Sequence, residues 1–312
     1  MERISASMTG GKRAHGAATL IAGPTASGKT ALAVEMAVKT GAVIINADSM
    51  QVYDVLDRLT ARPSASELAA APHHLFGHVS PADAYSVGQW SRDVEVLLAG
   101  PLADRSVIIV GGTGLYFRAL EGGLSTMPPV PDIIRQNLRA RWQSEGSEAL
   151  HAELAQCDPS AAAAIGKNDA QRILRALEVF EASGVPLTEH QGKGSMPLVD
   201  LEKTRRLLLV PDRGELRMRI AERFETMMAG PAVDEVRHLL SLKLDRSLPA
   251  MRAIGVAQIA AMLDGQIEKG EAIVQSINAT RQYAKRQTTW FRNQLGPEWE
   301  RLDRCQPPVY IA

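Results

Sequence analysis

The chain has 312 residues, and its 35 Lys and Arg are balanced by 35 Asp and Glu, so its formal net charge is zero. With 45% hydrophobic and 22% charged residues, its composition excludes a disordered, collagen-like or disulfide-scaffold protein. Zero net charge also excludes a uniformly basic coat for nucleic acid, but it allows a local basic face balanced by acidic residues elsewhere.

Three short apolar runs near the start of the chain predict strands of one sheet. They are residues 18–22 (ATLIA), 42–47 (AVIINA) and 106–110 (SVIIV). Because these runs are continuously apolar rather than alternating, we expect a parallel sheet covered by helices on both faces. Residues 207–210 predict a further strand about a hundred residues later, which implies an intervening insertion.

Residues 23–30 (GPTASGKT) match the phosphate-binding pattern G-x-x-x-x-G-K-[ST] between a predicted strand and a predicted helix. The glycines let successive backbone N–H groups point inward, and the following helix adds its positive end. Lys29 supplies a charge, and Thr30 can ligate Mg²⁺. The pattern predicts an α/β fold with a P-loop NTPase-like parallel sheet core and a polyphosphate site. The predicted phosphate-binding residues are Gly23, Pro24, Thr25, Ala26, Ser27, Gly28, Lys29 and Thr30.

A proline-rich segment at residues 127–131 marks the exit from this first part, and the chain from there to about residue 200 is mainly helical and rich in alanine. We expect residues 126–199 to form a helical insertion domain. Residues 1–125 and 200–312 would form the catalytic core, with helices from Glu215 onward.

The phosphate loop alone leaves its ligand open. A nucleotide kinase or NTPase is the first candidate, but the chain has no N-K-x-D motif for guanine. The run at 42–47 leads directly into Asp48. This carboxylate is either associated with magnesium or aimed at an acceptor substrate, and a helix-capping Asp is the plain structural alternative.

Seven segments, in order along most of the chain, resemble the bacterial tRNA dimethylallyltransferases. They are GPTASGKT (23–30), NADSMQVY (46–53), TARP (60–63), PHHL (72–75), VGGTGLY (110–116), DAQRILRAL (169–177) and ATRQYAKRQTTW (279–290). The resemblance implies transfer of a dimethylallyl group from dimethylallyl diphosphate to N6 of the adenosine next to the anticodon on its 3′ side. It also implies Mg²⁺ as cofactor and a tRNA anticodon stem-loop as partner, in tRNAs that read codons beginning with U.

This chemistry assigns roles to the strand ends. The phosphate loop would stabilise the departing diphosphate, and Asp48 would accept the proton of the adenine amine. Thr113 follows the strand at 106–110, and its hydroxyl would contact the same amine, although a turn hydroxyl is the structural alternative. Arg219 and Arg223 resemble a family arginine that reaches the diphosphate. An ion pair with Glu215 or Glu222 is an equally good explanation for them.

The resemblance also implies a tRNA-binding set that spans the core and the insertion. It consists of Asp48, Ser49, Met50, Gln51, Thr113, Arg135, Gln171, Arg172, Ile173, Leu174, Arg175, Arg281 and Lys285. Residues 279–295 contain no acidic residue. On a helix, Arg281, Lys285 and Arg292 share a face that would meet solvent or RNA, and Tyr283 and Trp290 on the opposite face would enter the core.

Two segments depart from the family pattern: residues 54–59 lack its glycines, and Val256 replaces its tyrosine. A small-molecule kinase, an isopentenyltransferase acting on free AMP, and an RNA-binding NTPase without transfer chemistry remain as alternatives. A metal site at His73, His74 and His78 is disfavoured because no carboxylate or Cys stands at a recognised spacing.

Cys157 and Cys305 lie outside any zinc-binding pattern, so we expect reduced thiols. No apolar run approaches the ~18 residues of a membrane span, and the first sixteen residues lack the apolar core of a signal peptide. We therefore expect a cytoplasmic monomer with no membrane association.

Overall fold

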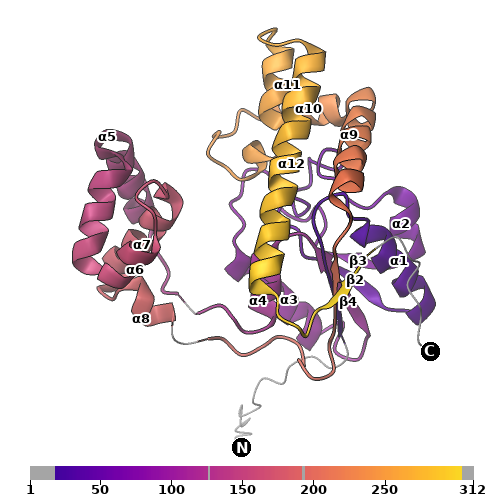
Figure 1. Cartoon of the computed structure of the whole chain (residues 1–312), viewed down its shortest axis with the longest axis horizontal. Helices are drawn as coiled ribbons and strands as arrows, with labels where there is room; N and C mark the ends of the chain where they lie inside the picture. Colours follow the sequence, from indigo (N-terminus) through magenta and orange to yellow (C-terminus); the bar gives the residue numbers. More distant parts are fainter. Residues whose placement is uncertain (1–17, 126, 192–193, 304–312) are drawn as a thin grey trace, which may run out of the picture. The chain divides into compact units, whose positions relative to one another are not determined.

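The structure, a computed structural model, describes residues 18–125, 127–191 and 194–303, which divide into two compact units (Figure 1). One unit comprises the described residues up to Glu121 together with those from Leu198 onward, and the other is Gly122–Pro197. The sequence pattern predicts an insertion over residues 126–199. Cys157 is a free, partly buried thiol, and Cys305 lies outside the described residues.

Within the described residues, the first unit is built on a six-stranded sheet in which every pairing is parallel. The strands are β1 (Ala18–Ala22), β2 (Val43–Asn46), β3 (His73–His74), β4 (Val107–Gly111), β5 (Arg205–Leu209) and β6 (Glu300–Leu302). Their order is β3-β2-β4-β1-β5-β6, so β4 lies between β1 and β2. The predicted α/β fold with a parallel sheet core is confirmed, and β2 and β4 are buried along their whole length.

The two edge strands were not predicted. Strand β3 has two residues and β6 has three, and their side chains are polar or only partly buried. Strand β5 begins two residues before the predicted run, at Arg205 and Arg206, which form ion pairs with Glu300 and Glu121 at 3.0 and 3.2 Å. These two charged residues lie outside the apolar run, so the sequence pattern predicts the start of β5 two residues late.

Helices cover the sheet and extend beyond it in the second half of this unit (Figure 1). They are α1 (Lys29–Thr40), α2 (Ala65–Ala70), α3 (Val87–Ala99), α4 (Gly114–Leu120), α9 (Arg213–Ala229), α10 (Ala232–Ser241), a 3₁₀ helix (Ala250–Arg252), α11 (Val256–Leu263) and α12 (Lys269–Gln294). Helix α12 packs against α9 and α11. None of the helices in the described ranges has the length and apolarity needed to cross a membrane.

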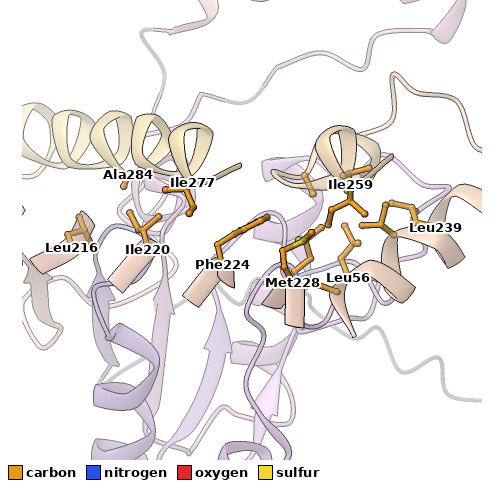
Figure 2. Packing of buried hydrophobic residues seen from close by; sticks show 14 residues of the cluster. Leu56, Leu216, Ile220, Phe224, Met228, Leu239, Ile259, Ile277 and Ala284 are labelled. Carbon is orange, nitrogen blue, oxygen red and sulfur yellow. The ribbon is translucent and has the colours of Figure 1, made fainter. Parts of the chain in front are cut away.

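A core cluster joins α9 to its neighbours (Figure 2). Leu216, Ile220, Phe224 and Met228 recur every fourth residue, so they line one face of α9. Figure 2 shows this face against side chains from α11 and α12. The cluster fixes α9 and α12, which both carry candidate site residues.

Both departures from the family pattern lie in this cluster. Leu56 and Leu59 are buried in it, and so is Val256 at the start of α11. Glu235 of α10 accepts hydrogen bonds from the backbone N–H groups of Arg58 and Leu59 at 2.7 and 3.0 Å. The segment at 54–59 is therefore held by packing and by a carboxylate in place of tight glycine turns.

The second unit is helical and has its own apolar core. Its helices are α5 (Asp132–Cys157), α6 (Pro159–Ala164), α7 (Ala170–Ser183) and α8 (Leu187–Gln191). Helix α5 is interrupted at Gly146, where φ is 81°. Asp169 caps α7 by accepting a hydrogen bond from the backbone N–H of Arg172 at 3.3 Å. The helical character predicted for this part of the chain is confirmed.

Candidate active site

The phosphate loop connects β1 to α1, as its sequence pattern predicts. Ala26 and Gly28 both have positive φ, 63° and 83°. Alternation of this kind turns successive backbone N–H groups toward one side and forms an anion-binding concavity at the start of a helix. Ser27 lies in this loop with its hydroxyl buried and without a hydrogen-bond partner among the described residues. The loop therefore has unused donors for an anionic ligand.

Lys29 is a buried cation at the base of this loop. Its side chain is 8% exposed, and its ammonium group donates to the carbonyl oxygen of Pro24 at 3.3 Å. Burial lowers the pKa of Lys29 to about 8, with Asp48 raising it and Arg223 lowering it. Desolvation makes the charged form costly in the free protein, so an anion bound in the loop would stabilise it.

The two candidate arginines of α9 differ in position. Arg223 donates to the Thr25 hydroxyl at 2.6 Å, so it lies at the phosphate loop. Burial lowers the pKa of Arg223, and the charge of Asp48 opposes this shift. Arg219 instead pairs with Glu215 at 3.4 Å on the surface. Arg219 thus forms the surface ion pair with Glu215 that was the alternative to a diphosphate contact, while the position of Arg223 favours it as a diphosphate ligand.

Asp48 follows the end of β2 and is 9% exposed. Its backbone N–H donates to Asn46 Oδ1 at 2.8 Å, and Asn46 Nδ2 donates to its carbonyl oxygen at 2.9 Å. Asp48 Oδ1 accepts from the backbone N–H of Met50 at 3.0 Å. Oδ1 of Asp48 is thus hydrogen-bonded within the turn, and Oδ2 takes no part in that bond.

The charge of Asp48 affects the pKa values of two nearby tyrosines. Tyr116 and Tyr283 both have pKa values raised mainly by burial, and Asp48 raises them further. The ring of Tyr116 stacks on Trp90 at 4.2 Å between centroids, and the Trp90 indole donates to the Asn46 carbonyl at 2.8 Å. The charge of Asp48 therefore influences both cationic and aromatic side chains near the phosphate loop.

Thr113 lies where β4 ends and α4 begins. Its hydroxyl accepts from the backbone N–H of Ser49 at 2.9 Å and donates to the Ser49 hydroxyl at 3.2 Å. The β4 exit can approach this closely because Gly111 has no side chain: a Cβ there would lie 2.0 Å from the carbonyl oxygen of Ala47. The two strand ends that carry Asp48 and Thr113 are consequently in direct contact.

Met50 and Gln51, predicted to contact tRNA, are engaged within the protein. Gln51 is 8% exposed, and its Nε2 donates to the carbonyl oxygens of Thr60 and Ala61 at 3.0 and 2.8 Å. Met50 packs against two apolar clusters. These contacts hold the loop after Asp48 in place, so the side-chain amide nitrogen of Gln51 is already used.

Helix α12 buries a different face from the predicted one. Ala284, Gln287 and Phe291 are buried, while Tyr283 and Trp290 are only partly buried. The reason is that Gln287 reaches two backbone groups: it accepts from Thr25 N at 2.8 Å and donates to the Gly112 carbonyl at 2.8 Å. Arg281 also departs from the prediction, because its guanidinium is partly buried and donates to the carbonyl of Arg217 at 3.5 Å.

The exposed side of α12 carries a shallow groove with basic, polar and aromatic character. It is lined by Gln282, Lys285, Arg286, Thr289, Trp290, Asn293 and Gln294. The Arg286 guanidinium also lies 5.8 Å from the ring centroid of Tyr283. Basic groups interleaved with an aromatic ring suit a nucleic-acid backbone and an unstacked base. Lys285 keeps its predicted exposed position.

In the helical unit, the predicted RNA-binding arginines are exposed or partly exposed, and each is paired locally. Arg135, Arg172 and Arg175 form i,i+3 ion pairs with Asp132, Asp169 and Glu178 at 2.8, 3.5 and 3.3 Å. The pairs of Arg135 and Arg172 are exposed and contribute little to stability, so these arginines can exchange partners with phosphate.

The three other residues predicted for this surface differ in burial. Gln171 is exposed, Leu174 is partly buried, and Ile173 is 1% exposed in the core of the unit. Ile173 therefore supports α7 and offers no side-chain surface for RNA.

Asn46, Gln287, Tyr116 and Tyr283 are site residues that the sequence interpretation did not assign. All four fall inside segments that resembled the family, which was the available signal. The described residues hold no group of three or more His, Cys, Asp and Glu side chains suited to a metal. His73, one of the three histidines considered, hydrogen-bonds through Nδ1 to the Ala71 carbonyl at 2.7 Å.

Two protein-family models match the part of the chain that contains the candidate site. A family model described as IPP transferase matches residues 51–294, and a model described as isopentenyl transferase matches residues 16–74. The chain belongs to the IPP transferase family. The resemblance seen in its motifs is confirmed.

Two curated relatives are more than half identical to this chain over the aligned residues. The tRNA dimethylallyltransferase of Chelativorans sp. (strain BNC1) is 58% identical over 286 residues, covering 91% of this chain and 98% of the relative. That of Rhizobium johnstonii is 53% identical over 286 residues, covering 91% and 96%.

Solved structures share the fold. The tRNA isopentenylpyrophosphate transferase of Bacillus halodurans is 33% identical with a TM-score of 0.64, covering 92% of this chain and 89% of the other. A eukaryotic dimethylallyltransferase described as acting on tRNA is 25% identical with a TM-score of 0.78, covering 93% and 74%.

Proposed function

We propose that this chain is a tRNA dimethylallyltransferase. It transfers a dimethylallyl group from dimethylallyl diphosphate to N6 of the adenosine on the 3′ side of the anticodon, in tRNAs that read codons beginning with U. The observation that carries this proposal is the placement of Asp48 beside the cationic phosphate loop, with Lys29 and Arg223 both responding to its charge. The family membership of the chain supports it.

The phosphate loop stabilises the leaving group. Breaking the allylic C–O bond places the electron pair on the diphosphate, where inward N–H groups, Lys29 and Arg223 can hold it. Such donors contribute most in a site from which water is excluded, and Lys29 is buried. Charge that builds up only as the bond breaks favours the transition state over the bound donor.

The residues of the loop also fit Mg²⁺. This ion prefers oxygen ligands and keeps several waters, so one protein hydroxyl with diphosphate oxygens is sufficient. The available groups are the hydroxyl of Thr30, in the first turn of α1, and that of Ser27, which has no hydrogen-bond partner among the described residues. When bound there, Mg²⁺ would add positive charge beside the leaving oxygens.

Asp48 and Thr113 act on the acceptor. As the new C–N bond forms, the N6 proton becomes acidic, and the Asp48 carboxylate accepts it. Thr113 already accepts from Ser49 N, and its oxygen has a second lone pair that can hold the amine in line. The products are N6-(dimethylallyl)adenosine and diphosphate.

Basic residues of both units bind the tRNA anticodon stem-loop. Bases in a single-stranded loop can be splayed out at low cost, so the target adenine can leave its stack and reach Asp48. Lys285 on α12 and Arg135, Arg172 and Arg175 in the helical unit are exposed or partly exposed for phosphate contacts. Because its substrate is tRNA, we also propose that the enzyme is cytoplasmic. We propose that it is a monomer, and light scattering in solution would test this oligomeric state.

The test is incubation of the full chain with labelled dimethylallyl diphosphate, Mg²⁺ and an unmodified tRNA that carries adenosine next to the anticodon. We expect one label per tRNA, located on that adenosine, and one diphosphate released per transfer. The same tRNA with guanosine at that position is the control. Equal labelling of free AMP would favour a free-nucleotide transferase, and ATP hydrolysis without labelling would favour a kinase or NTPase.

A further inference from the structure

Gln287 connects the donor side of the candidate site to its acceptor side. It lies on α12, and its two backbone partners belong to the phosphate loop and to the exit of β4. Resting on the proposed function, we propose that Gln287 is a positioning residue that sets the diphosphate loop at the correct distance from Thr113 and Asp48.

The two hydrogen bonds of Gln287 are complementary. Its Oε1 accepts from the backbone N–H of Thr25 at 2.8 Å, and its Nε2 donates to the carbonyl oxygen of Gly112 at 2.8 Å. The side chain is 6% exposed, so both bonds are shielded from water. A carboxylate would lose the donor and an apolar side chain would lose both bonds, which leaves a primary amide as the group that satisfies both partners.

The surroundings leave little room for another arrangement. A Cβ at Gly112 would lie 2.3 Å from Gln287 Nε2, and one at Gly114 would lie 2.2 Å from the ring of Trp290. Helix α12 therefore lies directly on the turn that holds Thr113. Because the two are in close contact, a shift of α12 would displace the turn at residues 112–114 as well.

Thr25 is held from two helices at once. Gln287 of α12 binds its backbone N–H, and Arg223 of α9 donates to its hydroxyl. Asp48 is linked to the same frame, because Thr113 bonds to the adjacent Ser49. Without Gln287, the loop would keep its link to α9 but lose its link to the β4 exit. Misplacement of reacting groups by ~1 Å can reduce a rate by ~10²-fold.

The experiment compares Gln287→Met and Gln287→Asn with the unaltered full chain. Methionine keeps the length and loses both bonds, while asparagine keeps the amide but is one methylene too short to reach both partners. In a single-turnover transfer from bound dimethylallyl diphosphate to tRNA, we expect a rate lower by ~10²-fold for each variant. The dissociation constants of both substrates should change by less than about threefold, because the groups that bind them remain.

A matched control comes from the same helix. Gln275 is exposed, and its amide donates to Glu271 on the same helix at 2.9 Å, so Gln275→Met should leave rate and affinities unchanged. Amide hydrogen exchange reports the bond itself: in the Gln287 variants, exchange should rise in residues 23–30 and 112–114 and not in the sheet.

The outcomes separate this inference from the proposed function. If the unaltered chain labels no tRNA, the proposed function fails, and the exchange measurement still tests the link. If the unaltered chain transfers normally and both Gln287 variants do so as well, Gln287 has no positioning role. A rate loss explained entirely by weaker substrate binding, or by exchange rising throughout the unit, would also overturn it.

Discussion

Asp48 is held in the site by its neighbours in the chain. Asn46 bonds to both the N–H and the carbonyl of Asp48, and Met50 N–H occupies one carboxylate oxygen. The carboxylate therefore has a fixed direction before substrate arrives. A base that is already oriented needs no rearrangement in the transition state, and this is the condition for effective proton transfer.

Replacing Asp48 by Asn keeps this shape and removes the proton acceptor. We expect the single-turnover transfer rate to fall by ~10²-fold or more, with binding of dimethylallyl diphosphate little changed. Rapid-quench kinetics and a separate donor-binding titration would measure the two effects. Turnover equal to that of the unaltered enzyme would remove Asp48 from the base role.

Lys29 predicts a pH dependence of donor binding. Its pKa is about 8 in the free protein, mainly because of burial, and a bound diphosphate raises it by opposite charge. Below pH 8 the group is already protonated, so it adds no pH dependence. Above that pH, binding must take up a proton, and affinity should fall by up to about tenfold per pH unit. Calorimetric titration with inorganic pyrophosphate between pH 7 and 10 would show this.

The Lys29→Met variant is the control for that titration. It should bind pyrophosphate more weakly at every pH and lose the added slope above pH 8, because the titrating group is gone. A slope that persists in Lys29→Met would assign the effect to another group.

At the scale of elements, the sequence predicts what is local and misses what depends on distant partners. Strands β1, β2 and β4 are readable because burial on both faces makes each a continuous apolar run. The edge strands β3 and β6 have no such run. The sequence pattern predicts an aromatic core face for α12, yet polar Gln287 is buried there, where it bonds to two backbone groups. These partners lie 175 and 262 residues away in the chain. No local pattern contains that information.

The same distinction applies to the candidate site. The phosphate loop and Asp48 follow from short motifs at strand ends. Of the two arginines on α9, only contacts with Thr25 and Glu215 separate Arg223 from Arg219. Equal spacing on one helix face could not distinguish them.

Helix α9 links the core to the site, because Arg223 precedes Phe224 of the buried cluster. Truncating Phe224 to Ala should destabilise the unit by about 3–5 kcal/mol, through lost burial and the cavity left behind. Equilibrium unfolding in urea would measure this free energy. Phe224→Leu, which keeps most of the volume, should cost clearly less. Equal costs for the two variants would mean that the cavity does not contribute.

At the scale of the whole molecule, zero net charge coexists with surfaces that suit RNA. Lys285 and Arg286 line the groove on α12, which contains no acidic residue. In the helical unit the arginines are instead matched by nearby carboxylates, such as Asp169 beside Arg172. When RNA binds to the helical unit, an arginine exchanges its carboxylate partner for a phosphate. The contribution of these arginines to RNA affinity should therefore depend on the salt concentration.

Replacing Arg172 and Arg175 together by Ala tests this exchange. Each lost phosphate contact should reduce the slope of log K against log salt by ~0.7–0.9, so the double variant should lose up to about 2 units of slope. The KM for tRNA should rise at low salt, while the KM for dimethylallyl diphosphate stays the same, because the donor loop lies in the other unit. Fluorescence titrations with an anticodon stem-loop at several salt concentrations would measure the slope.

A matched control is Arg237→Ala, which removes an exposed arginine that likewise pairs with an acid three residues earlier, Asp234. It should leave the salt slope of the stem-loop unchanged, since α10 carries none of the residues assigned to RNA. If Arg237→Ala lowers the slope as much as the double variant does, the effect reports general surface charge. If neither changes it, the arginines of α7 are solvated ion pairs, and specificity for tRNA must come from α12 and the loops that follow β2 and β4.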